Sequence, residues 1–135
     1  GGVRYYNDSI ASSPSRTIAG LRCFPEKVIL IAGGYDKHIP FDTLGPEIVA
    51  HVKKLFLTGA TAEKIRAAVE AAPNYAPGRP EIAQIDDFQD AVMAAHWAAE
   101  PGDVVLLSPA GAAFDKFKNF MERGETFKRI VNELK

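Results

Sequence analysis

Three segments of the sequence combine residue types that could hold a charged ligand. Residues 6–12, YNDSIAS, carry an amide, a carboxylate and two serine hydroxyl groups. Residues 31–37, IAGGYDK, place an ammonium group shortly after a Gly-Gly turn. Residues 108–113, SPAGAA, are small enough for backbone N–H groups to approach a ligand closely. The ammonium group could reach over the edge of the fold, and the small residues leave room for a ligand, so these segments are candidates for a binding site.

Other kinds of chemistry lack the residues that they need. The sequence has no Gly-x-Ser-x-Gly turn, and its serines have no evident histidine base, so nucleophilic catalysis is not expected. Its three histidines, His38, His51 and His96, fall on a loop and two helices, with no cysteine or carboxylate at the spacing of a metal site. The sequence also has no Gly-x-x-x-x-Gly-Lys-Ser/Thr phosphate loop. We therefore predict no metal site and no phosphate cradle in this chain.

Five strands that alternate with helices are predicted from hydrophobic periodicity and turn residues. The strands are expected around Val3 and Tyr5 and over residues 27–32, 53–58, 81–85 and 104–107. The first three helices are expected after a cap at Ser12 or Ser13, from about 43 to 51, and from a cap at Thr61 to about 72. Two more are expected, one from a capping box at Asp86 and Gln89 to about 100 and one over 122–134. A polar helical segment is expected at 114–123. This alternation predicts an α/β fold. We expect a Rossmann-like three-layer sandwich with a mainly parallel sheet of five to six strands and helices on both faces.

The strand at residues 104–107 is predicted to lie in the middle of the sheet. It is a continuous apolar run, VVLL, which is typical of a strand buried on both faces. In open α/β sheets, ligands bind outside the carboxyl ends of the strands. Because each candidate segment follows a predicted strand, we expect the three segments to meet at that edge.

Composition indicates one domain over residues 1–135. The chain is 47% hydrophobic, and its 16 basic and 17 acidic residues give a net charge of −1, so neither nucleic acid nor an anionic membrane is expected as a partner. The single cysteine, Cys23, agrees with a cytoplasmic location. No apolar run approaches the ~18 residues of a membrane-spanning helix. The chain begins in a strand pattern without a methionine, so we expect a fragment of a longer protein. We also expect that protein to be a monomer.

The three segments resemble motifs of the Mur ligase family. Residues 106–124, LLSPAGAAFDKFKNFMERG, resemble its C-terminal signature LLSPACASFDQFKNFEERG. YNDSIAS resembles the family's YNDSKAT, and IAGGYDK resembles its GGxDK. The motifs span nearly the whole chain in the family's order. The resemblance is strongest to members that add D-glutamate to UDP-N-acetylmuramoyl-L-alanine in peptidoglycan synthesis, and it implies a C-terminal, amino-acid-binding domain.

The resemblance implies a site for the two carboxylates of D-glutamate. Lys37 matches the lysine that binds one carboxylate, and Ser12 matches a threonine whose hydroxyl contacts the amino acid. Phe114 and Phe120 match positions where the family holds the other carboxylate. Ala113 stands where the family has a serine, so one hydroxyl donor is absent, and a backbone N–H or a water could replace it.

The resemblance also implies that this chain contacts a nucleotide. Asn7 and Asp8 match a segment in which the aspartate lies near the nucleotide, where a carboxylate would accept hydrogen bonds from ribose hydroxyls. Ile10 replaces a family lysine, so any contact by that ammonium is lost. The family binds ATP and Mg²⁺ mainly in a central domain that this chain lacks. We therefore expect a domain of an ATP-dependent ligase that has no catalytic residue of its own and is inactive when isolated.

Simpler interpretations remain open at this stage. Residues 108–113 could be only a tight connection, Lys37 a solvated side chain, Ser12 a helix cap and Phe120 a core aromatic. The chain could also belong to a Mur-type ligase with a different acceptor amino acid. A further alternative is a free-standing, non-catalytic Rossmann-like module that binds a nucleotide or a small acid.

Overall fold

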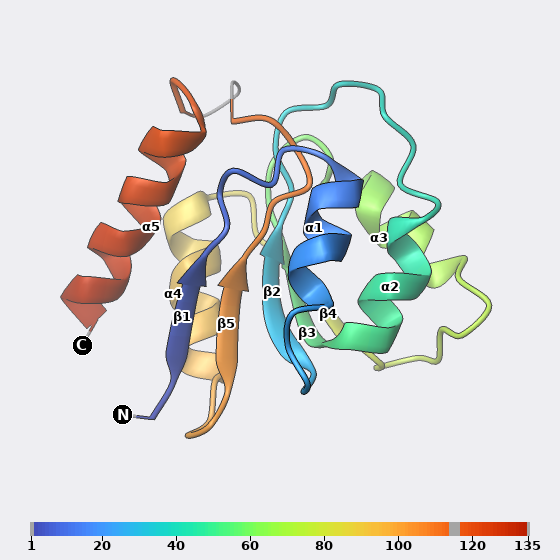
Figure 1. The fold of residues 1–135 in the computed structure, drawn as a ribbon, viewed down its shortest axis with the longest axis horizontal. Coiled ribbons are helices and arrows are strands. Elements are labelled where there is room, and N and C mark those ends of the chain that lie inside the picture. The colour runs from blue at the N-terminus through green and yellow to red at the C-terminus, as the bar shows by residue number, and fades with distance from the viewer. Residues whose placement is uncertain (1, 114–116, 135) are drawn as a thin grey trace.

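Strands and helices alternate along the chain, as the sequence predicts. The computed structural model describes residues 2–113 and 117–134. In chain order the elements are β1 Arg4–Asn7, α1 Pro14–Leu21, β2 Val28–Ala32, α2 Leu44–His51, β3 Val52–Leu57, α3 Ala62–Glu70, β4 Glu81–Gln84, α4 Phe88–Ala98, β5 Val104–Leu107 and α5 Phe120–Leu134. This order confirms the α/β class (Figure 1).

The strands of the described residues form one parallel sheet. Its order is β1-β5-β2-β3-β4, so β5 is hydrogen-bonded to both β1 and β2. Val105 of β5 is in register with Tyr5 on one side and Ile29 on the other. All four residues of β5 are buried. The strand is therefore an interior one, as predicted, although β2 and not β5 is the central strand of the five in the described sheet.

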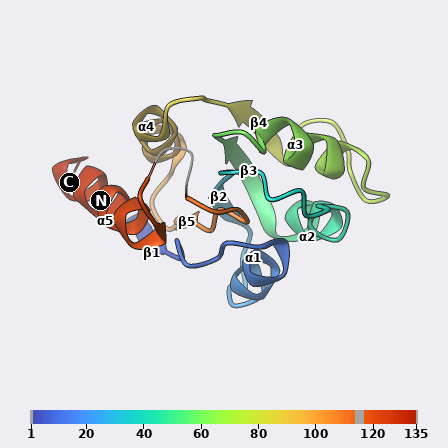
Figure 2. The same ribbon diagram turned by 90° about the horizontal axis from the view of Figure 1, so that it is seen from above.

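Helices cover both faces of the sheet and make the expected three layers. Figure 2 shows α1, α2 and α3 on one face and α4 and α5 on the other. Neighbouring residues of β2 point to opposite faces, as a strand requires. Leu30 belongs to the apolar cluster under α1, α2 and α3, whereas Ile29 and Ile31 belong to the cluster under α4 and α5. No described helix is long and apolar enough to cross a membrane.

The predicted cap of α4 is wrong by one residue. The N-cap is Asp87, whose side chain accepts a hydrogen bond from the backbone N–H of Asp90 at 3.0 Å, so the predicted pair of Asp86 and Gln89 makes no capping box. At the other end the helix stops at Ala98, because Ala99 is already extended. Asp86 and Asp87 are adjacent and either could cap the helix, so the sequence pattern alone did not identify Asp87 as the N-cap.

The start of α5 also differs from the prediction. Residues 117–119 are bends, and the helix begins at Phe120, two residues before the predicted start. The Asn119 side chain accepts a hydrogen bond from the backbone N–H of Glu122 at 2.9 Å, which fixes this start. The polar helical segment expected over residues 114–123 is therefore wrong from residue 117 to 119, and residues 114–116 lie outside the described residues.

Candidate functional site

The loops that follow β1, β5 and β2 lie side by side at the carboxyl edge of the sheet. Backbone hydrogen bonds join them. Asp8 N donates to the Leu107 carbonyl at 2.7 Å, and Ala110 N donates to the Ala11 carbonyl at 2.9 Å. Tyr35 N donates to the Ala112 carbonyl at 2.8 Å. The predicted meeting of the three motif segments is therefore confirmed, and it follows from the strand order.

Asp8 lies where the β1 loop meets β5 and α1. Its Oδ2 accepts a hydrogen bond from Ser108 Oγ at 2.7 Å. Ser108 Oγ also lies 3.1 Å from Thr17 Oγ1, which donates to the Ser108 carbonyl at 3.1 Å. A Cβ at Gly20 would lie 2.7 Å from Asp8 Oδ2, so the glycine allows α1 to approach the carboxylate. The position of the Asp8 side chain is thus fixed by two neighbouring elements.

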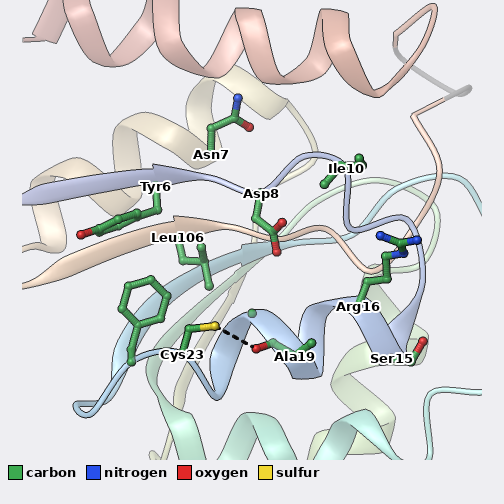
Figure 3. A pocket seen from close by; sticks show the side chains of 11 residues that line it. Tyr6, Asn7, Asp8, Ile10, Ser15, Arg16, Ala19, Cys23 and Leu106 are labelled. Carbon is green, nitrogen blue, oxygen red and sulfur yellow. Dashed lines mark hydrogen bonds between the residues drawn. The ribbon is translucent and has the colours of Figure 1, made fainter.

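A groove of about 590 Å³ lies between β1 and α1, and Asp8 points into it (Figure 3). Tyr6 and Phe24 form part of its apolar wall, with their ring centroids 5.0 Å apart. Arg16 of α1 lines the groove as well. Asn7 points to the opposite side of the strand in Figure 3, and its Oδ1 accepts from Ser9 N at 3.1 Å. The two predicted nucleotide-binding residues therefore face different sides of β1.

Ser12 precedes α1 and is not its cap. The N-cap is Ser13, and its side chain makes no capping hydrogen bond. Ser12 is half-buried, and its hydroxyl has no hydrogen-bond partner among the described residues. The helix-cap interpretation of Ser12 is therefore wrong, and its hydroxyl remains available to a ligand.

Lys37 lies on the exposed loop after β2. Among the residues that the structure describes, its ammonium has no ion-pair partner. The preceding Asp36 is the residue that anchors the loop: its carboxylate pairs with Lys64 of α3 and accepts a hydrogen bond from His38 N at 2.8 Å. These two hydrogen bonds, that of Lys64 first, lower the pKa of Asp36 below its ordinary value. The anchored neighbour leaves the charge of Lys37 free to meet a ligand.

Phe120 lies at the start of α5, close to the β1 loop. Its ring is partly exposed and lines a small hollow of about 230 Å³ together with Ser9 and Ile10. Its carbonyl accepts a hydrogen bond from Ser9 Oγ at 2.7 Å. Phe120 is therefore not a core aromatic. Phe114 lies outside the described residues.

Arg123 is a site residue that the sequence analysis missed. Only 2% of its surface is exposed. Its guanidinium donates from Nε to Ser9 Oγ at 3.0 Å, from Nη2 to the Ser9 carbonyl at 2.7 Å and from Nη1 to the Gly111 carbonyl at 3.0 Å. Helical spacing could have revealed it, because Arg123 precedes the inward Phe127 by four residues and must share its face.

The structure places Ser12, Lys37 and Phe120, the predicted substrate-binding residues that it describes, on one edge, and no hydrogen bond or ion pair joins their side chains. Lys37 belongs to the loop that is bonded to residue 112, and Phe120 is bonded to the loop that carries Ser12. Their roles in binding an amino acid stay predictions. Among the described residues, no group of three histidine, cysteine or acidic side chains could hold a metal ion. The hydroxyl, carboxylate and ammonium groups on this edge can bind and orient a small ligand through hydrogen bonds and charge.

Comparison with known proteins gives a consistent set of relatives. The profile of the family described as "Mur ligase, glutamate ligase domain" matches residues 1–111. The UDP-N-acetylmuramoylalanine–D-glutamate ligase of Acetivibrio thermocellus is 55% identical over 135 residues, which cover 98% of this chain and 29% of that protein. The ligase of the same name from Clostridium beijerinckii is 52% identical over 133 residues, with the same coverage. The chain thus spans less than a third of these curated relatives.

Solved structures show the same fold at low sequence identity. A murein peptide ligase from Psychrobacter arcticus matches with a TM-score of 0.62 and 14% identity over 98% of this chain and 28% of the other. A domain described as that of a UDP-N-acetylmuramate:L-alanyl-gamma-D-glutamyl-meso-diaminopimelate ligase from Haemophilus ducreyi matches with a TM-score of 0.56 and 18% identity. That match covers 98% of this chain and 89% of the other.

Proposed function

The chain belongs to the Mur ligase family, through its glutamate ligase domain, and we propose that it is the D-glutamate-binding domain of a longer ATP-dependent ligase. This ligase joins D-glutamate to UDP-N-acetylmuramoyl-L-alanine in cytoplasmic peptidoglycan synthesis and acts as a monomer. The relatives at 52–55% identity carry the name of that enzyme, which favours D-glutamate over other acceptors.

The observation that carries the proposal is the exposed ammonium of Lys37, which has no ion-pair partner among the described residues and lies on the edge where the three loops meet. D-Glutamate has two carboxylates and one amine, so its recognition requires a cation and several hydrogen-bond donors. Lys37 supplies the cation from the loop after β2, and the half-buried hydroxyl of Ser12 supplies a donor from the loop after β1. Backbone around Phe120 and Phe114 completes the site for the second carboxylate in this proposal.

The task of this domain in the reaction is to position the acceptor. In the proposed ligase, ATP phosphorylates the terminal carboxylate of the UDP-linked substrate, and the amine of D-glutamate attacks the acyl phosphate and displaces phosphate. A bound and oriented amine reacts far faster than a free one. Fixing both carboxylates leaves the amine as the group that faces the acyl phosphate, and closure over the central domain excludes water.

ATP and Mg²⁺ are bound mainly by the central domain in this proposal, with one contribution from this chain. The Asp8 carboxylate faces the groove between β1 and α1, where it can accept hydrogen bonds from ribose hydroxyls. Asn7 faces the other side of the strand, so its contribution would be to hold the β1 loop through its bond to Ser9 N. Ile10 offers no charge to a phosphate.

Kinetics of the full-length gene product tests the proposal. We expect ADP release that depends on D-glutamate and not on L-lysine or meso-diaminopimelate. Lys37→Ala is expected to raise the KM for D-glutamate by about tenfold or more, because a charged hydrogen bond to the substrate is lost. The matched control is Lys27→Ala, since Lys27 is an exposed lysine just before β2, at the end of this strand opposite to the loop of Lys37. An unchanged KM in Lys37→Ala would remove this residue from the site.

The second candidate, a free-standing binding module, predicts a different result. Such a module would bind D-glutamate or a nucleotide as the 135-residue chain alone, and the gene would encode no phosphate loop upstream. The ligase domain, in contrast, is expected neither to hydrolyse ATP nor to form the amide bond on its own. The reading frame upstream in the gene separates the two functions, because an encoded phosphate loop supports the ligase and a start codon next to Gly1 supports the module.

A further inference from the structure

The guanidinium of Arg123 lies at the point where all three loops of the candidate site approach α5. It donates to the loop after β1 at Ser9 and to the loop after β5 at Gly111. The loop after β2 packs beside it, since a Cβ built on Gly34 would lie 3.2 Å from Nη1. A guanidinium holds its donors in a rigid planar fork, so the distances between these acceptors are set by one group.

Ser9 transmits this geometry to the start of α5. It is 3% exposed, and its hydroxyl donates to the Phe120 carbonyl while it accepts from Arg123 Nε. Arg123 and Phe120 are three residues apart on the same helix, so Ser9 closes a small ring of contacts between the helix and the β1 loop. A shift of the guanidinium would therefore move the Phe120 backbone and the loop that leads to Ser12.

Packing alone does not account for an arginine at this position. Phe127, Ile130 and Val131, which follow on the same face of α5, fill the core with apolar side chains. A buried cation loses its hydration, and an apolar residue of similar length would avoid that cost. The hydrogen-bond fork is what an apolar residue could not supply.

We propose that Arg123 is a positioning residue that sets the acceptor site, holding the three loops at the separation that fits the two carboxylates of D-glutamate. This inference rests on the proposed function. Arg123 does not touch the substrate, because its guanidinium is buried beneath the loops. It acts through Ser9 and Gly111, and a displacement of about 1 Å in a substrate-positioning group can change rates by roughly a hundredfold.

The test compares Michaelis constants for the three substrates in the full-length ligase. Arg123→Lys keeps the charge and the aliphatic stem but loses the fork. We expect the KM for D-glutamate to rise roughly 10- to 100-fold, while the KM values for ATP and the UDP-linked substrate stay within about twofold. The matched control is Arg129→Ala, because Arg129 is an exposed arginine of the same helix that pairs with Glu133 four residues on. It should leave all three constants unchanged.

A second variant and a rescue experiment cover the case in which Arg123→Lys does not fold. Ser9→Ala keeps the arginine and removes the hydroxyl that joins it to Phe120, so it should raise the KM for D-glutamate several-fold. Methylguanidinium added to Arg123→Ala should lower the KM for D-glutamate and have no such effect on Lys37→Ala. An unchanged KM in the folded variants, or an equal rise in all three constants, would overturn the inference. If ADP release by the wild-type enzyme did not depend on D-glutamate, the proposed function would instead be refuted, and this inference with it.

Discussion

Two regions of opposite physical character form the candidate site. The region around Arg123, Ser9 and Ser108 is buried, and each of these polar side chains is hydrogen-bonded to more than one partner. The loop at residues 35–40 is exposed, with Tyr35 at 45% and Ile39 at 39% exposure. It is held by the ion pair of Asp36 with Lys64 and by the backbone hydrogen bond from Tyr35 N to the Ala112 carbonyl.

The two regions have different tasks: the buried one fixes the distances between the loops, and the exposed one provides a charge that can bind a ligand. Buried, fully bonded side chains have one arrangement, so they can fix distances between loops. An exposed ammonium such as that of Lys37 interacts weakly with a carboxylate in open water and more strongly once water is excluded. Selectivity for a doubly acidic amino acid is therefore expected only when the site closes, with the buried region already in place.

The largest effect is expected at Gly33, where the exposed loop leaves the buried region. Its φ is +114°, and a Cβ would lie 1.8 Å from the Thr58 carbonyl oxygen. Gly33→Ala should therefore lower the free energy of unfolding by about 4 kcal/mol or more or prevent folding, because both the backbone and the contact forbid a side chain. Urea denaturation followed by circular dichroism measures the loss.

A second glycine provides the control for backbone strain alone. Gly78 also has a positive φ, +77°, but nothing lies within 4 Å of its Cβ position. Gly78→Ala is expected to cost roughly 1 kcal/mol. Equal losses in the two variants would contradict the close packing assigned to the root of the exposed loop.

Sequence patterns predicted the parts of this structure that depend on local periodicity. The apolar run of β5 placed that strand inside the sheet, and the alternation of elements placed the three motif segments on one edge. The cap of α4 was missed by one residue, because Asp86 and Asp87 are both capable of capping and only the tertiary position of the helix selects Asp87.

Helical spacing could have indicated the inward position of Arg123, but the partners of the buried side chains could not be predicted in the same way. Arg123 was overlooked because charged residues are usually exposed, and its acceptors come from loops about 12 and 114 residues away in sequence. Ser12 was open to interpretation as a helix cap, and only the fold shows that Ser13 occupies that position. Long-range contacts of this kind leave little trace in one sequence.

An intermediate effect is expected from Thr17, which stabilises the buried region from α1. Thr17 is fully buried, and its hydroxyl donates to the Ser108 carbonyl at 3.1 Å. Thr17→Val keeps the shape and leaves this carbonyl without that donor, so it should cost about 1–3 kcal/mol of unfolding free energy. Thr126→Val is the control, since Thr126 bonds to its own helix at the surface and should change stability by less than about 0.5 kcal/mol. A loss as small as that in Thr17→Val would show that the buried region is less tightly determined than its hydrogen bonds imply.

The smallest effect is expected in the exposed loop and should depend on pH. The hydrogen bond from Lys64, followed by that from His38 N, lowers the pKa of Asp36 below 3.8 in the folded protein. A carboxylate with a lowered pKa stabilises the folded state fully above the unfolded pKa and loses this contribution as the pH falls through the folded pKa.

Asp36→Asn keeps an acceptor for His38 N but removes the charge. Its Tm should therefore lie slightly below that of the wild type at pH 6, and the difference should shrink as the pH falls below the ordinary value of 3.8. A Tm difference that does not shrink between about pH 6 and pH 2.5 would mean that contacts of Asp36 other than this ion pair cause the loss, and that the contrast with the buried region is weaker than proposed.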